Sequence, residues 1–131
     1  MQICMLNGSP RIHGNTAELC KPFVEELTSG GAQLTLYTLA QQNVSSCKGC
    51  YHCQDVSGEY GCFQQDDMQK IAQSIIESDL IVLATPIYTW FCTTELKAVL
   101  DRFYGLAKYY RSATGNFVEG KRIAVLATHG Y

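Results

Sequence analysis

The chain has 131 residues, of which 47% are hydrophobic and 17% charged, and its formal net charge is −2. This composition excludes an intrinsically disordered chain, and a pI near 5.9 argues against a nucleic-acid binder held by a basic patch. No apolar run approaches the roughly 18 residues of a membrane span, and the sequence starts without the basic region of a signal peptide. We therefore expect one domain over residues 1–131 of a soluble, cytoplasmic protein, with no nucleic-acid or membrane partner.

Strand and helix patterns alternate along the chain. Continuous apolar runs are typical of buried parallel strands, and apolar residues at helical spacing after a polar start indicate helices. In chain order we expect a strand at Gln2–Leu6, a helix from Asn15 to Gly30, a strand at Gln33–Leu39, a helix from Asp66, a strand at Leu80–Ala84, a helix from Thr93 to Leu106 and a strand at Arg122–Thr128. This order predicts an α/β fold with a mostly parallel sheet.

Two features depart from a regular α/β chain. The connection over residues 40–65 is far longer than the usual few residues, so we expect it to hold a site. The sequence also ends directly after its fourth strand, where an open doubly wound sheet normally continues with a further helix and strand. We expect either a truncated form or a partner that covers the exposed sheet edge.

The loop over residues 8–16 joins the first strand to the first helix. Backbone N–H groups and the helix dipole bind phosphate at such a junction, and Ser9, Arg11, Asn15 and Thr16 add donors and charge. The loop lacks the glycine spacing and the lysine of a P-loop, and it has no dinucleotide G-x-G-x-x-G motif. A terminal monophosphate therefore suits it best, the alternative being a plain strand-to-helix turn.

The loop that follows the third strand carries three aromatic residues, Tyr88, Trp90 and Phe91. An amphipathic aromatic side chain at the carboxyl edge of a sheet can stack on a planar cofactor and still find a hydrogen bond. We interpret this loop as cofactor lining. The alternative places Trp90 and Phe91 in the core or in a subunit contact.

The seven cysteines are an odd number, which argues against a disulfide framework and favours metal or redox chemistry. Four of them fall in one stretch: Cys47, Cys50, Cys53 and Cys62. Three closely spaced cysteines and a fourth are typical of a [4Fe–4S] site. Two alternatives stay open, a structural zinc site and a set of free or reversibly paired thiols.

The sequence resembles the flavodoxin-like NAD(P)H-dependent FMN reductase family and, within it, the iron–sulfur flavoproteins. The matching segments keep the family's order and extend over nearly the whole chain. They are 6–11 (LNGSPR), 14–17 (GNTA), 47–53 (CKGCYHC) with Cys62, 66–68 (DDM), 78–88 (SDLIVLATPIY) and 96–102 (LKAVLDR).

The resemblance implies a doubly wound parallel sheet of order 2-1-3-4, with the family's fifth strand missing, and FMN at the carboxyl ends of the strands; flavodoxin is a type example of this placement. By position, the phosphate would be held by Ser9, Arg11, Asn15 and Thr16, with Ala17 also at the cofactor. The isoalloxazine would be lined by Pro86, Ile87, Tyr88, Thr89 and Trp90, and its other side closed by Thr128, His129 and Gly130.

The activity that this resemblance implies is flavin oxidoreduction, in which NAD(P)H reduces bound FMN. Electrons would then pass to a small-molecule or protein acceptor or to a cluster on the four loop cysteines. Because the cofactor supplies the chemistry, we assign no side chain as strictly catalytic. We also expect a homo-oligomer, a dimer or tetramer. The alternatives are an electron carrier without turnover and a truncated chain that works only with partner subunits.

Overall fold

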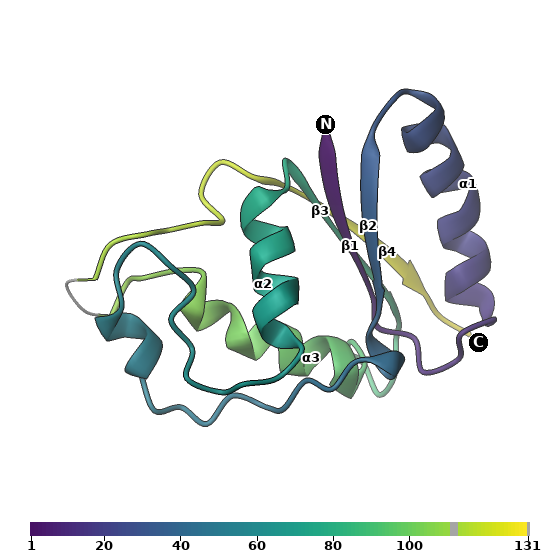
Figure 1. The fold of residues 1–131 in the computed structure, drawn as a ribbon. Coiled ribbons are helices and arrows are strands. Elements are labelled where there is room, and N and C mark those ends of the chain that lie inside the picture. The colour runs from purple at the N-terminus through teal and green to yellow at the C-terminus, as the bar shows by residue number, and fades with distance from the viewer. Residues whose placement is uncertain (111–112, 131) are drawn as a thin grey trace.

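The computed structural model describes residues 1–110 and 113–130. Its four strands are β1 (Gln2–Asn7), β2 (Gln33–Thr38), β3 (Leu80–Pro86) and β4 (Arg122–Thr128). They form one parallel sheet in the order β2-β1-β3-β4 (Figure 1). This confirms the predicted flavodoxin-like order. The second strand ends one residue earlier than expected, because Leu39 begins a 3₁₀ turn, η1 (Leu39–Gln41).

Helices cover both faces of the sheet. Helix α1 (Asn15–Ser29) lies on one face, and α2 (Met68–Glu77) and α3 (Thr94–Asp101) lie on the other (Figure 1). The third helix is shorter than predicted, because the chain tightens at Asp101 into a 3₁₀ turn, η3 (Arg102–Gly105). A further 3₁₀ turn, η2 (His52–Asp55), lies in the long connection over residues 42–67, which contains four cysteines and is called the cysteine loop below.

The sheet separates two apolar cores, since successive residues of a strand point to opposite faces. Toward α1, the core is formed by Ile3, Met5, Cys20, Val82 and Ala84. Toward α2 and α3, it includes Cys4, Leu6, Ile71, Ile75, Ile81, Leu96 and Val99. Burial in this second core raises the pKa of the Cys4 thiol to about 12. Cys4 and Cys20 therefore behave as small buried apolar residues, whereas Cys92 is only partly buried.

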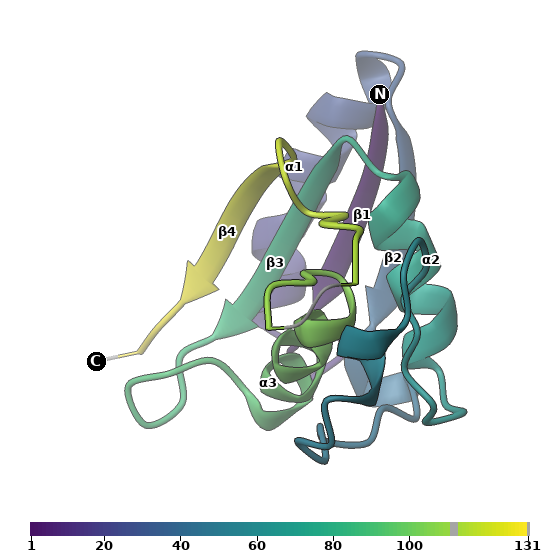
Figure 2. The same cartoon turned by 90° about the vertical axis from the view of Figure 1, so that its left-hand side faces the viewer.

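Strand β4 lies at the edge of the sheet, and in Figure 2 no helix crosses its near face. Two of its apolar side chains are open to solvent there, Ile123 at 56% and Val125 at 62% exposure. They pair in register with Ile81 and Leu83 of β3, so they belong to the sheet face that α2 and α3 cover elsewhere. Within the described ranges, no helix is long and apolar enough to cross a membrane.

Candidate functional site

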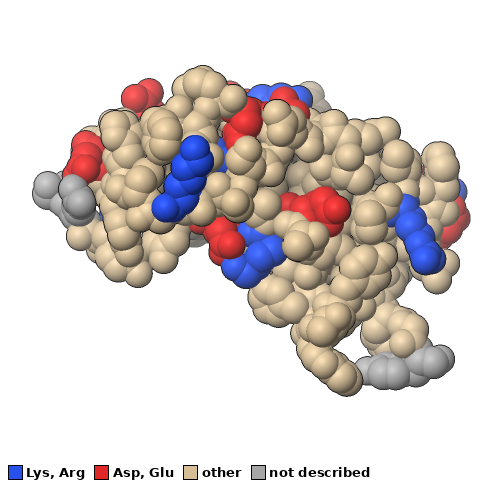
Figure 3. Space-filling model, turned by 90° about the horizontal axis from the view of Figure 1, so that it is seen from below, with Lys and Arg blue, Asp and Glu red and all other residues tan. Residues whose placement is uncertain are grey.

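A pocket of about 280 Å³ lies at the carboxyl edge of the sheet, where the β1–α1 loop, the β3–α3 loop and the end of β4 meet. It is lined by Ser9, Arg11, Gly14, Asn15, Thr16, Pro86, Ile87, Tyr88, Thr128, His129 and Gly130. The three segments come together because parallel strands end at the same edge of a sheet. Seen from this end of the molecule, basic and acidic side chains lie scattered among uncharged ones (Figure 3).

The β1–α1 loop is shaped by short polar contacts. The Asn7 side-chain oxygen accepts from the Ser9 N–H at 3.0 Å. The Ser9 hydroxyl in turn donates to the Arg11 carbonyl at 3.0 Å and accepts from the Arg11 N–H at 3.2 Å. These contacts bend the chain so that α1 begins at the pocket. Sequence reasoning missed Asn7, whose place at the end of a buried strand was its only signal.

The first turn of α1 lies open toward the pocket. Gly14 is the N-cap residue, and no side chain caps the helix. The first N–H groups of a helix have no partner within the helix, and with the helix dipole they favour a bound anion. A side chain at Gly14 would place its Cβ 3.0 Å from the Arg11 Cβ, so glycine allows the loop to pass this close to the start of the helix.

The β3–α3 loop contains a strained two-residue turn. Tyr88 and Phe91 exchange backbone hydrogen bonds of 2.9 and 3.1 Å, and Thr89 and Trp90 between them have φ of 46° and 69°. This left-handed backbone costs roughly 1–3 kcal/mol per residue when glycine is absent. The turn presents Trp90 to solvent at 87% exposure.

Three of the predicted cofactor residues lie outside the lining of the main pocket. Thr89 and Trp90 line an adjoining hollow of about 190 Å³, which shares Ile87, His129 and Gly130 with that pocket. Ala17 lines neither space, because it lies deeper in α1. The other predicted residues meet at one place.

Hydrogen bonds join the walls of the pocket to one another. The Thr16 and Thr128 hydroxyls lie 2.8 Å apart, which links the first turn of α1 to the end of β4. The Ile87 N–H donates to the Thr128 carbonyl at 2.8 Å, which links the β3–α3 loop to the same strand. These hydrogen bonds therefore fix the start of α1 and the β3–α3 loop relative to the end of β4.

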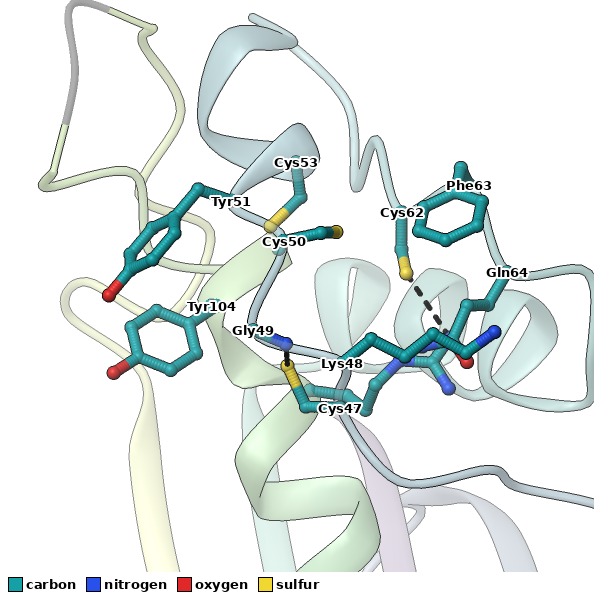
Figure 4. Close-up of a pocket in the computed structure, with 12 residues that line it drawn as sticks. Cys47, Lys48, Gly49, Cys50, Tyr51, Cys53, Cys62, Phe63, Gln64 and Tyr104 are labelled. Carbon is teal, nitrogen blue, oxygen red and sulfur yellow. Dashed lines mark hydrogen bonds between the residues drawn. The ribbon is translucent and has the colours of Figure 1, made fainter.

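A second pocket, of about 130 Å³, lies in the cysteine loop. Its lining includes all four predicted ligands, Cys47, Cys50, Cys53 and Cys62. Figure 4 shows their sulfur atoms around one space between the two arms of the loop. Left-handed backbone at Gly49 (φ 63°) and Tyr51 (φ 59°) turns the chain sharply between the first three cysteines.

The pocket offers the thiol donor set of a metal centre. In the described part of the chain, no three His, Cys, Asp or Glu side chains are placed to hold one metal ion. A structural zinc site needs four ligands around a single ion, with Zn–S distances of about 2.3 Å. Ligands of a [4Fe–4S] cluster bind four separate irons, so their sulfur atoms surround a larger space. The donor set, four thiols around one hollow, fits the ligands that such a cluster needs.

Arg102 lines this pocket and follows directly after α3. Lys97 and Asp101 form an exposed ion pair, but Arg102 is only 2% exposed. Its guanidinium donates to both carboxylate oxygens of Asp66, at 2.8 and 3.2 Å. Burial alone would lower the pKa of Arg102, but Asp66, with Tyr60 and Cys62, outweighs burial and raises it.

Arg102 also reaches two other parts of the loop. It donates to the Ser45 carbonyl at 2.9 Å and to the Cys62 sulfur at 3.3 Å. The Ser45 N–H donates to Asp66 at 2.9 Å. One buried ion pair thus joins the start and the end of the cysteine loop.

Lys108 and Gln54 hold the middle of the loop. The Lys108 ammonium donates to the carbonyls of Cys53 and Tyr60, at 2.6 and 2.9 Å. Gln54 is fully buried; its amide nitrogen donates to the Tyr104 carbonyl, and its oxygen accepts from the Tyr109 N–H at 3.1 Å. Sequence reasoning missed both residues, because no local pattern predicts contacts between positions about 55 residues apart.

Comparison with known proteins agrees with this geometry. The NADPH-dependent FMN reductase family matches residues 1–131, and the chain belongs to that family. An iron–sulfur flavoprotein of Archaeoglobus fulgidus is 33% identical over 95 residues, which are 72% of this chain and 42% of that protein. An iron–sulfur flavoprotein of Methanosarcina thermophila is 29% identical over 102 residues, 78% of this chain and 52% of that protein.

A solved NAD(P)H:quinone oxidoreductase from Methanothermobacter marburgensis has the same fold. It matches with a TM-score of 0.77 at 21% identity, over 100% of this chain and 66% of that one. The chain spans about half the length of the curated relatives named above.

Proposed function

We propose that this chain, as one domain, binds FMN in the pocket at the carboxyl edge of the sheet and passes electrons from NAD(P)H through the flavin to a small-molecule or protein acceptor. The observation that carries the proposal is the meeting of three segments in one pocket: the uncapped start of α1, the backbone of 86–88 and the end of β4. Membership of the FMN reductase family supports the same assignment.

The residues of the pocket fit the parts of FMN. The open first turn of α1, with Asn15 and Thr16, offers donors to a phosphate. Pro86, Ile87 and Tyr88 offer an apolar wall and backbone groups to a planar ring. When bound, FMN supplies the hydride and electron chemistry, and the chain's own residues bind it, orient it and limit the access of water.

The second part of the proposal places a [4Fe–4S] cluster on Cys47, Cys50, Cys53 and Cys62. The four thiols line one pocket, and curated relatives carry the name iron–sulfur flavoprotein. The β3–α3 loop and the cysteine loop lie on opposite sides of α3 (Figure 2). The cluster would then be a second redox centre, which receives its electrons from the flavin.

The third part of the proposal is assembly as a homo-oligomer, a dimer or tetramer. Exposed apolar side chains support it at two places: Ile123 and Val125 on β4, and Trp90 and Phe91 on the β3–α3 loop. Sedimentation equilibrium over a range of protein concentrations tests this part. A monomer throughout that range would refute it.

The flavin assignment is tested by a Ser9→Ala, Asn15→Ala double variant. We expect FMN to bind at least tenfold more weakly, measured by quenching of flavin fluorescence on titration with protein. Ser29→Ala, at the far end of the same helix, is the matched control and should bind as the wild type does. Unchanged affinity in the double variant would refute the phosphate assignment.

The cluster assignment is tested by single cysteine-to-serine variants of the four loop residues, prepared anaerobically. Each should lose most of its iron and acid-labile sulfide, whereas Cys20→Ser, outside the loop, should keep them once corrected for folded protein. Iron and sulfide well below stoichiometry in the wild type would refute the cluster.

A further inference from the structure

Two buried cations from the segment that follows α3 bind the cysteine loop, and the first of them, Arg102, also lines its pocket. They are Arg102, at 2% exposure, and Lys108, at 9%. We propose that these two buried side chains stabilise the reduced state of the bound cluster, with Arg102 acting as a positioning residue on the Cys62 sulfur. The inference rests on the proposed cluster.

The contacts of Arg102 place it on a ligand atom as well as on the loop backbone. Its guanidinium donates to the Cys62 sulfur at 3.3 Å, while Asp66 and the Ser45 carbonyl fix its orientation. The buried Nε of Arg102 has no hydrogen-bond partner among the described residues. The Tyr60 hydroxyl is a further electrostatic neighbour of both Arg102 and Cys62.

The two buried cations differ in how their positive charges are compensated. Asp66 compensates Arg102 directly. The hydrogen-bond partners of Lys108 are the carbonyls of Cys53 and Tyr60, and over residues 1–110 and 113–130 it forms no ion pair with a carboxylate. A buried charge without a directly paired counter-ion is costly. Thiolates that hold a cluster would supply the missing negative charge.

The contacts of Lys108 support this interpretation. Its ammonium binds the carbonyl of Cys53, one of the proposed ligands, and that of Tyr60, two residues before Cys62. The positive charge is therefore held beside two of the proposed ligands, one on each arm of the loop.

The expected consequence concerns reduction potential. A cluster gains negative charge when it is reduced, and hydrogen bonds to its sulfur atoms and nearby positive charge stabilise that state. Both cations should therefore raise the potential of the cluster. A purely structural clamp would change how much cluster forms and leave the potential of the cluster that forms unchanged.

The test uses Arg102→Gln, Arg102→Lys and Lys108→Met in the full chain, with the cluster assembled anaerobically. Lys97→Met is the matched control, because it removes a positive charge from the exposed face of α3. Midpoint potentials are measured by redox titration followed by electron paramagnetic resonance, and iron and sulfide are counted for each protein. We expect Arg102→Gln and Lys108→Met to hold at least a tenfold larger oxidised-to-reduced ratio at a fixed potential, which is about 59 mV for a one-electron couple.

Arg102→Lys keeps the charge and loses the paired hydrogen bonds, so its potential should lie between those of the wild type and Arg102→Gln. Lys97→Met should match the wild type. Cluster-containing variants with the wild-type potential would overturn the inference, and so would loss of the cluster from all three, which leaves a structural role only. A wild type without iron and sulfide would instead overturn the proposed cluster itself.

Discussion

The hydroxyl of Thr93 donates a hydrogen bond of 2.6 Å to the carbonyl oxygen of Gly8. The same hydroxyl oxygen accepts from the Leu96 N–H at 3.3 Å and so caps α3. Thr93 is 2% exposed, and its own N–H donates to the Thr85 hydroxyl at 3.2 Å. One side chain therefore fixes the β1–α1 loop and the β3–α3 loop, the two loops proposed to bind FMN, relative to each other.

Replacing Thr93 by Val should weaken both stability and flavin binding. The substitution removes a helix cap and leaves the buried Gly8 carbonyl without its partner, at a cost of about 2 kcal/mol. The free energy of unfolding in urea and the FMN dissociation constant measure the two effects. Thr93→Ser keeps the hydroxyl and should recover most of both, and a Thr93→Val protein equal to the wild type would show that this contact carries neither.

Gly8→Ala should destabilise the fold by about 1–3 kcal/mol through overpacking. A Cβ at this position would lie 2.8 Å from both the Leu96 Cβ and the Thr93 hydroxyl oxygen. Thermal unfolding compares it with Gly30→Ala, where the nearest atom to a new Cβ is 3.4 Å away. Equal destabilisation by the two substitutions would contradict the close approach at Gly8.

The strained turn at Thr89 and Trp90 predicts a gain in stability that is separable from flavin binding. Thr89→Asn should stabilise the chain by about 1 kcal/mol, because Asn adopts positive φ more easily than Thr. Adding Trp90→Gly should stabilise it further but weaken FMN binding, since it removes an aromatic wall of the adjoining hollow. Calorimetry and flavin titration separate the two effects; a double variant that binds FMN as tightly as Thr89→Asn does would exclude a contact between Trp90 and the flavin.

The Asp66–Arg102 pair predicts a specific acid sensitivity. Burial alone would raise the pKa of Asp66, but hydrogen bonds from Arg102 and Ser45 outweigh burial and lower it. As the pH falls, Asp66 is therefore protonated at a higher pH in the unfolded chain than in the folded protein. The contribution of Asp66 to stability is present above its unfolded pKa, about 3.9, and is lost as the pH falls through its lower folded value.

Asp66→Asn should accordingly cost about 3 kcal/mol at neutral pH, because it leaves the buried Arg102 without its counter-charge. Its stability should also change less with pH below about 4 than that of the wild type. Asp101→Asn, which breaks the exposed pair with Lys97, should stay within about 1 kcal/mol. Urea unfolding at a series of pH values measures both proteins, and parallel pH profiles for Asp66→Asn and the wild type would contradict the assignment.

The local sequence predicts most of the sheet and most of the residues that line the two pockets. Apolar runs such as 2–6 and 80–84 are visible as strands because both of their faces are buried. The four cysteines meet because they lie in one loop. The burial of Arg102 could not be predicted, because it depends on Asp66, 36 residues earlier in the chain.

The local sequence also does not predict the positive φ values of Thr89 and Trp90, because neither residue is a glycine or asparagine. The contacts of Lys108 and Gln54 depend on how the cysteine loop folds back on the segment after α3. Tertiary contacts between segments distant in the sequence therefore decide the parts that the sequence did not predict.

The most direct test of the central claim is an absorption spectrum of the anaerobically prepared chain after addition of FMN, recorded before and after NADPH. We predict flavin bands with a broad shoulder at about 400 nm from the cluster, and bleaching of the flavin bands by NADPH. Bleaching would also separate an oxidoreductase from an electron carrier without turnover. A colourless protein that takes up no FMN would contradict the account.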